Sequence, residues 1–196
     1  MEDVKEKKLK LRRETESRIA ALGRSKMEKK KSAIVKQLFE FANFKEAETV
    51  FFYGGPEDKS AAENIPALCI DAGKQVAIPL FAPHKPEKMQ LFKISQINED
   101  LRPGPQGHLE PDPKKCKTIP FEDVDIAIIP GVAFDEKGGR LGSGSGHYDR
   151  LMSLLPNTAR KVALAFEEQV FSAIPMESHD KYVDIIITEK RIIYKI

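Results

Sequence analysis

The sequence has 196 residues, 41% of them hydrophobic and 32% charged, with a formal net charge of +2 at pH 7. This length and composition indicate one globular domain spanning 1–196 with a full-sized core. No apolar run approaches the roughly 18 residues needed to cross a bilayer, and no apolar segment follows the charged N-terminus as in a secretory signal. Cys69 and Cys116 lack zinc-site spacing and fit a reducing compartment. We therefore expect a cytoplasmic protein without a membrane partner.

The positive charge is concentrated at the N-terminus. Residues 1–31 carry twelve Lys/Arg and six Asp/Glu, which leaves the remainder of the chain with a net charge of −4. This composition predicts a basic helical arm over about 1–31. Such arms bind nucleic acid, membrane surfaces or anionic small ligands, but most of their charges lie on a solvated helix face. Nucleic acid is therefore not expected as a partner.

Two helices are predicted first, one from Val4 to about Leu22 and the other from about Lys26 to Ala42. The second has the clearer apolar stripe, which consists of Ile34, Val35, Leu38, Phe39 and Ala42. A strand is predicted at 49–53, before a Gly-Gly-Pro turn. A further helix is predicted at about 61–72, and Gly73 ends it.

The remaining pattern alternates apolar strands with short connections. Residues 98–120 hold five prolines and two glycines and are predicted to cross the molecule irregularly. Strands are expected at 75–79, 89–94, 124–129, 161–166, 183–188 and about 191–195. Strands that alternate with helices indicate an α/β fold with a largely parallel sheet covered on both faces. Ligands of such sheets collect beyond the carboxyl ends of the strands.

A glycine-rich segment follows the strand predicted at 124–129. Glycines occupy positions 131, 138, 139, 142, 144 and 146, and a short helix is predicted from Tyr148 to Leu155. A strand, a glycine loop and a helix start together expose backbone N–H groups to phosphate. The segment therefore predicts a phosphate-ligand site.

Two common phosphate motifs are disfavoured at this loop. A Walker loop requires a lysine after its last glycine, and none is present. A dinucleotide fingerprint requires Gly-x-Gly-x-x-Gly directly after the strand, whereas these glycines lie farther on with a different spacing. Glu167 and Glu168 lie about 20 residues beyond the loop, which leaves a nicotinamide-dependent oxidoreductase as a weak alternative.

The segment closely resembles the 5-formyltetrahydrofolate cyclo-ligase family. That family carries Pro-Gly-x-x-Phe/Tyr-x-x-x-Gly-x-Arg-Leu-Gly-x-Gly-x-Gly-Tyr-Tyr-Asp here, and the matching residues are Pro130, Gly131, Phe134, Gly138, Arg140, Leu141, Gly142, Gly144, Gly146, Tyr148 and Asp149. Four other segments are similar to family elements in the same order: KLKLR (8–12), GPQGHLEP (104–111), ALAFEEQ (163–169) and HDKYVDIIITE (179–189). The resemblance covers essentially the whole chain.

The resemblance implies a fold and an activity. The fold is a three-layer α/β/α architecture related to ribose-5-phosphate isomerase and the CoA-transferases. The activity is an ATP- and magnesium-dependent ligation that converts 5-formyltetrahydrofolate to 5,10-methenyltetrahydrofolate, ADP and phosphate. The implied small-molecule partners are ATP and a reduced folate, and a monomer or weak dimer is expected.

The resemblance also implies site residues. The implied ATP-binding residues are Lys8, Arg12, Arg140, Leu141, Gly142, Ser143, Gly144, Ser145, Gly146, His147 and Tyr148. The implied folate-binding residues are Lys59, Ser143, Gly144, Ser145, Gly146 and His147. No residue is assigned a catalytic role beyond binding. On residue pattern alone, Lys8 and Arg12 are one helical turn apart and can face one ligand, although a surface pair is also consistent.

Asp149 and Asp184 are the implied magnesium ligands, a number that suits magnesium. A helix-capping role is the alternative for Asp149. Asp184 precedes an apolar strand, so we expect it to reach the site only if that strand is antiparallel to the one ending at Ile129.

Three positions depart from the family pattern. Ser145 stands where lysine is frequent, His147 replaces a tyrosine, and Lys59 aligns with a glutamate that contacts the pterin, although Glu57 and Asp58 are adjacent. These differences concern substrate contacts rather than the core. They leave open a relative with a different substrate and a non-catalytic paralogue that binds nucleotide or folate.

Overall fold

The computed structural model describes residues 3–52, 64–80, 89–104, 109–144 and 146–195. Lys59 and Ser145 lie outside this part of the chain. The helices are α1 (Val4–Ala20), α2 (Arg24–Glu40), α3 (Ala42–Glu46), α4 (Ile65–Asp71), α5 (Ile97–Asp100) and α6 (His147–Met152). Two short 3₁₀ turns described with them are η2 (Phe121–Asp123) and η3 (Glu167–Gln169). No helix among these ranges combines the length and apolar character that a membrane crossing requires.

An eight-stranded sheet forms the centre of the fold, in the order β13-β12-β10-β7-β1-β2-β3-β6. Its strands are β1 (Thr49–Phe52), β2 (Gln75–Leu80), β3 (Gln90–Ile94), β6 (Thr118–Ile119), β7 (Ile126–Ile128), β10 (Arg160–Leu164), β12 (Ile185–Ile187) and β13 (Ile192–Tyr194). The five central strands, β12 to β2, are parallel, and the outer pairings are antiparallel. The expected largely parallel sheet is confirmed.

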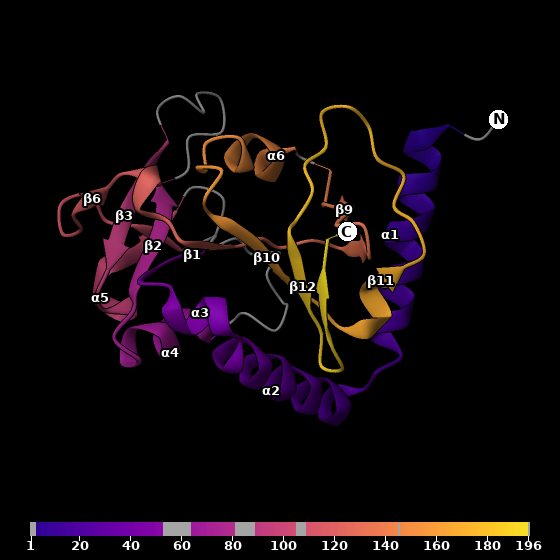
Figure 1. Ribbon diagram of the computed structural model, residues 1–196, viewed down its shortest axis with the longest axis horizontal. Helices are drawn as coiled ribbons and strands as arrows, with labels where there is room; N and C mark the ends of the chain where they lie inside the picture. Colours follow the sequence, from indigo (N-terminus) through magenta and orange to yellow (C-terminus); the bar gives the residue numbers. More distant parts are fainter. Residues whose placement is uncertain (1–2, 53–63, 81–88, 105–108, 145, 196) are drawn as a thin grey trace.

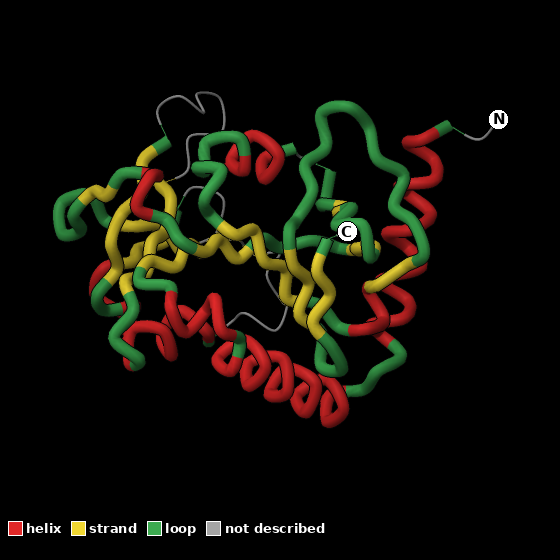
Figure 2. Tube along the Cα trace, in the orientation of Figure 1, coloured by secondary structure: helices red, strands yellow, loops and turns green. Residues whose placement is uncertain are grey.

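Alternate residues of the central strands supply two cores on opposite faces of the sheet. Val50 and Phe52 face the core that includes Ile34 and Leu38 of α2, whereas Phe51 faces the core that includes Tyr148 and other residues of α6. Figures 1 and 2 show α2, α3 and α4 below the sheet and α6 above it. The three-layer α/β/α architecture is therefore confirmed.

Two smaller sheets lie outside the predicted framework. One pairs β4 (Leu101–Pro103) with β5 (Leu109–Pro111), and the other has the order β11-β8-β9, from β11 (Val170–Phe171), β8 (Ala133–Asp135) and β9 (Arg140–Leu141). The second sheet was not expected, because its strands are only two or three residues long. It fixes the glycine-rich segment, since β8 and β9 form an antiparallel hairpin that begins directly beyond β7.

Helix α1 stands at one side of the sheet, next to β9 and β11 (Figure 1). Leu11 of α1 packs against the small core formed by Ala133, Leu141 and Ile174. Arg18 of α1 lies over the ring of Phe171, 4.2 Å from its centroid. The basic arm is therefore docked on the hairpin that carries the glycine segment.

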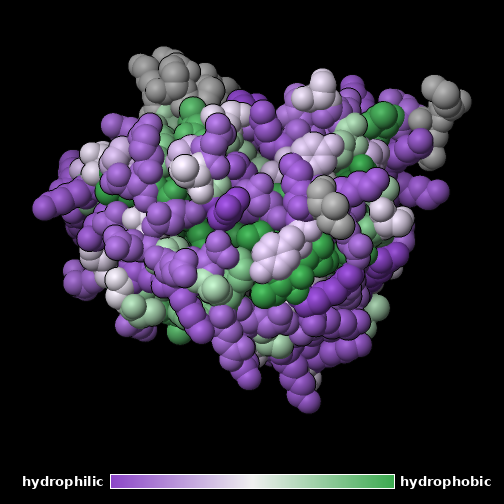
Figure 3. Space-filling model, viewed as in Figure 1, coloured by the Kyte–Doolittle hydropathy of each residue, from purple (hydrophilic) through white to green (hydrophobic). Residues whose placement is uncertain are grey.

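The face of the molecule seen in Figure 3 is mostly hydrophilic, with a hydrophobic area near its middle. Tyr182 and Tyr194 are among the exposed large hydrophobic side chains of the described residues, at 41% and 58% exposed. Both cysteines are free thiols, with Cys69 buried and Cys116 partly buried. Burial raises the pKa of the Cys69 thiol to about 12, which makes it unreactive.

Candidate active site

A cavity of about 290 Å³ lies where α1, the glycine loop, α6 and the segment before β12 meet. Its charged residues come from all of these elements, and most of the residues that line the cavity are polar or charged. Its lining consists of Lys5, Lys8, Arg12, Arg140, Leu141, Gly142, Ser143, Gly144, Gly146, Tyr148, Asp149, Glu177, His179 and Asp180. Most of the implied ATP-binding residues are therefore brought together.

Arg140 is the buried cation of the cavity wall. Its side chain is 1% exposed, and it donates from Nη1 to the backbone oxygen of Pro130 at 3.2 Å and from Nη2 to Oδ1 of Asp149 at 2.8 Å. Its Nε has no partner among the described residues. The guanidinium also lies 5.5 Å from the ring centroid of Tyr148. Arg140 thus ties the end of β7 to α6.

Local geometry favours glycine at two positions of the loop. A Cβ on Gly142 would lie 2.9 Å from Nη1 of Arg140, so a side chain there would require the guanidinium to shift. Gly146 precedes α6 with φ +65°, a left-handed conformation that side chains other than glycine rarely adopt. The glycine spacing therefore serves the position of Arg140 and the start of α6.

Lys8 and Arg12 are two of the cations through which helix α1 lines the cavity. Arg12 donates from Nε to the backbone oxygen of Gly142 at 2.9 Å, and Lys8 Nζ lies 2.7 Å from Oε2 of Glu177 and 2.6 Å from Oδ2 of Asp180. Burial would lower the pKa of Lys8, but its hydrogen bonds to Asp180 and Glu177 outweigh burial and raise the pKa above 10.5. Lys8 is therefore fully charged at neutral pH.

Asp149 and Asp180 are the two aspartates that line the cavity. Asp149 accepts hydrogen bonds at Oδ1 from Arg140 and from the backbone N–H of Lys181 at 3.0 Å. Asp180, whose side chain is 12% exposed, accepts at Oδ2 from the backbone N–H of Glu177 at 2.8 Å as well as from Lys8. Because Lys181 follows Asp180 directly, the same turn of chain holds both carboxylates in place.

Asp184 is not brought to the cavity. Strand β12 is parallel to β10, which is parallel to β7, so the antiparallel arrangement that Asp184 required is absent. Its Oδ2 accepts a hydrogen bond of 2.9 Å from the backbone N–H of Lys161 at the start of β10. The pairing of Asp184 with Asp149 is corrected on this geometry: Asp184 braces two strands, and Asp180 faces the cavity.

Sequence reasoning missed four residues of the lining: Lys5, Glu177, His179 and Asp180. The segment HDKYVDIIITE (179–189) is similar to an element of the family. Because Asp180 is its second residue, this similarity could have indicated Asp180 as a site residue. Of the remaining implied residues, Lys59 and Ser145 lie outside the described residues, and the side chain of His147 is not described.

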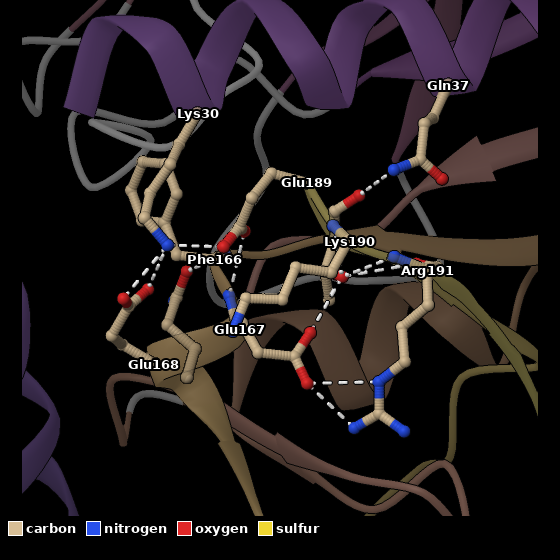
Figure 4. Close-up of polar contacts among 10 residues, drawn as sticks. Lys30, Gln37, Phe166, Glu167, Glu168, Glu189, Lys190 and Arg191 are labelled. Atoms are coloured by element: carbon tan, nitrogen blue, oxygen red, sulfur yellow. Dashed lines mark hydrogen bonds and ion pairs between the residues drawn. The ribbon is translucent and has the colours of Figure 1, made fainter. Parts of the chain in front are cut away.

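A polar network contacts the chain just before the β8–β9 hairpin. Gln169 of η3 donates from Nε2 to the backbone oxygens of Gly131 at 3.2 Å and Val132 at 3.0 Å, which fixes the chain where it leaves β7. The neighbouring Glu168 binds Lys30 of α2, and Lys30 also binds Glu189 (Figure 4). The network thus connects α2 to the segment that begins the site.

The family model for the 5-formyltetrahydrofolate cyclo-ligase family matches residues 4–189. The chain belongs to this family. Its cyclo-ligase relatives include a protein of Schizosaccharomyces pombe named as a probable 5-formyltetrahydrofolate cyclo-ligase, 29% identical over 97% of this chain and 98% of the relative. A Caenorhabditis elegans protein with the same name is 27% identical over 96% of each chain.

Solved structures agree with this membership. The NMR structure of Aquifex aeolicus 5,10-methenyltetrahydrofolate synthetase superimposes with a TM-score of 0.82 at 27% identity, covering 96% of this chain and 92% of that one. A 5,10-methenyltetrahydrofolate synthetase from Mycoplasma pneumoniae shares the fold, with a TM-score of 0.67 at 20% identity. The fold of the Aquifex aeolicus synthetase therefore covers 96% of this chain.

Proposed function

We propose that this protein uses ATP to close 5-formyltetrahydrofolate to 5,10-methenyltetrahydrofolate, with release of ADP and phosphate. The observation that carries the proposal is the convergence of Lys8, Arg12, the glycine loop and Asp149 on one polar cavity. Membership of the cyclo-ligase family supplies the reaction. The cavity supplies the kind of site that such a reaction needs.

The chemistry requires an activated formyl oxygen. A formyl amide is a poor electrophile because its nitrogen donates electrons into the carbonyl group and its oxygen is a poor leaving group. Transfer of the γ-phosphoryl group to that oxygen gives an iminium phosphate and ADP; N10 attacks the formyl carbon and gives up its proton to solvent, and the C–O bond breaks as phosphate departs. The protein then has to align the reactants and neutralise moving negative charge.

The cations of the cavity fit that task. Lys8 and Arg12 approach from α1, and the chain between Leu141 and Gly144 lines the same space. Ammonium and guanidinium groups with backbone N–H donors form charge-assisted hydrogen bonds to phosphate. We assign the triphosphate to this wall. Arg140 holds the loop and Asp149 rather than extending freely into the cavity, because its own Nη atoms are engaged.

Asp149 and Asp180 are the residues that we assign to magnesium. Both present carboxylate oxygens to the cavity, and magnesium takes one or two carboxylates together with water and substrate phosphates. Within the described ranges no group of three or more His, Cys, Asp or Glu side chains is placed to hold a metal ion, so water and substrate phosphates would supply the remaining ligands. The donor set therefore fits magnesium, which would supply charge neutralisation at the phosphates.

The test is absorbance at the methenyl-folate band after the protein is mixed with 5-formyltetrahydrofolate, ATP and magnesium. We expect ATP-dependent product, and kcat/KM for ATP roughly 10- to 100-fold lower in Lys8→Met, since a hydrogen bond to a charged group is lost. Lys7→Met is the matched control, because Lys7 is exposed on the same helix. Folded protein that binds ATP but forms no product would instead identify a non-catalytic paralogue.

A further inference from the structure

Lys8 is held between two carboxylates inside the cavity. Its Nζ lies 2.6 Å from Asp180 and 2.7 Å from Glu177, and the side chains of Lys8 and Asp180 are each 12% exposed. The oxygen of Asp180 that accepts from Lys8 also accepts from the backbone N–H of Glu177. The ammonium therefore occupies a formed set of acceptors rather than a loose surface contact.

The proposed function gives Lys8 and Asp180 different partners. Lys8 is assigned to phosphate and Asp180 to the divalent cation, yet in this structure they neutralise each other. Asp149 is likewise bound to a cation of the protein, Arg140. Each of the two carboxylates assigned to magnesium therefore already has an internal counter-ion.

The charges around the cavity point the same way. Four cations line it, Lys5, Lys8, Arg12 and Arg140, against the three carboxylates of Asp149, Glu177 and Asp180. Among the described residues, the formal charges of these seven Lys, Arg, Asp and Glu side chains sum to +1, which favours a polyphosphate over a free divalent cation. This balance of charge favours an anionic nucleotide over a lone cation as the ligand of the free cavity.

We propose that Lys8 and the divalent cation are alternative partners of Asp180, so that the free protein excludes the metal until a nucleotide draws Lys8 away. The inference rests on the proposed function. Phosphate oxygens that take up the ammonium free the carboxylate for the cation, and by linkage each ligand then strengthens the binding of the other. Glu177, whose side chain is 36% exposed, remains as a second acceptor that keeps Lys8 within the cavity as it changes partner.

The experiment titrates Mg²⁺ alone into nucleotide-free protein by calorimetry. In Lys8→Met we expect the affinity for Mg²⁺ to rise about fivefold or more, the lower range of typical coupling between sites. Metal-free ATP should bind more weakly to the same variant. The matched control is Lys5→Met, which removes an equal charge from the cavity lining but breaks no ion pair of the described residues. Equal Mg²⁺ affinities in Lys8→Met and Lys5→Met would overturn the proposal.

Two further variants identify the residue responsible for the rise in Mg²⁺ affinity. Lys8→Arg keeps a charged donor near the same acceptors and should bind Mg²⁺ within about twofold of wild type. Adding Asp180→Asn to Lys8→Met should abolish the rise in Mg²⁺ affinity. A rise that survives this change contradicts the proposal, because the cation would then bind elsewhere. These readouts do not depend on turnover, so absence of methenyl product would refute the proposed function without deciding the competition.

Discussion

Arg12 and Gly142 lie 130 positions apart in the sequence, and a hydrogen bond of 2.9 Å from Nε to the backbone oxygen joins them. This contact attaches the basic helix α1 to the loop on which the proposed nucleotide site is built. The nucleotide site therefore depends on how the first helix docks as well as on the glycine segment.

Arg12→Ala should weaken ATP binding about tenfold, because it removes a charged donor to phosphate. It should also release the loop from α1, because the hydrogen bond from Arg12 to the backbone oxygen of Gly142 is lost. Binding is measured by calorimetry, and loosening by amide hydrogen exchange at residues 141–144. Arg13→Ala is the control, since Arg13 is exposed on the same helix. An Arg13 variant that behaves like Arg12→Ala would show that net charge alone matters.

Asp180 and Asp184 are separated by three residues but have different expected roles. Asp180→Asn should raise the Mg²⁺ concentration for half-maximal activity about tenfold or more, because it removes one of two proposed carboxylate ligands. Asp184→Asn should leave that concentration within about twofold and lower the free energy of unfolding by about 1 kcal/mol, because it weakens the bond from Lys161. A larger magnesium effect for Asp184→Asn would reverse the assignment.

Gly142→Ala should displace Arg140, because the added Cβ would lie 2.9 Å from its Nη1. We expect about tenfold weaker ATP binding and about 1 kcal/mol lower stability, since a shift of the guanidinium weakens its bonds to Pro130 and Asp149. In an Arg140→Lys background, Gly142→Ala should lower ATP affinity and stability by less, because the guanidinium with which the added Cβ would clash is absent. A double-mutant cycle checks this, and strictly additive costs would refute the steric explanation.

Lys30→Met should lower the free energy of unfolding by about 3 kcal/mol, because it leaves Glu168 and Glu189 without their buried cation. Urea unfolding measures the loss. Lys36→Met on the same helix is the control, because Lys36 is 74% exposed and its loss should be nearly neutral. A Lys30 variant as stable as the Lys36 variant would show that the buried cluster contributes nothing.

The contribution of Lys30 also has a defined pH dependence. Burial would raise the pKa of Glu168, but the hydrogen bond and the charge of Lys30, together with a backbone hydrogen bond and the charge of Lys26, outweigh it, so the pKa lies below its ordinary value of 4.5. A carboxyl with a lowered pKa stabilises the fold above about pH 4.5 and loses that effect as the pH falls through the lowered value. The stability gap between wild type and Lys30→Met should therefore shrink below pH 4.5. A gap that widens there would contradict this linkage.

Local patterns in the sequence were enough to predict most of the secondary structure and the position of the glycine loop. The spacing of Ile34 and Leu38 predicted a buried helix face, and the β-branched runs predicted the parallel strands, because side-chain periodicity is set within one element. The glycines at 142, 144 and 146 similarly predicted a bare loop, because their missing side chains are visible in the chain itself. The sequence also carried the family resemblance that the match over 4–189 confirms.

Tertiary structure decided which distant side chains meet. Asp180 and Asp184 are separated by only three residues, and the parallel direction of β12 places one at the cavity and the other against Lys161. The small sheet of β8, β9 and β11 escaped prediction, because strands of two or three residues have no readable period. The pairing of Lys8 with Asp180 likewise depends on the docking of α1, which is fixed by long-range packing rather than by the helix's own residues.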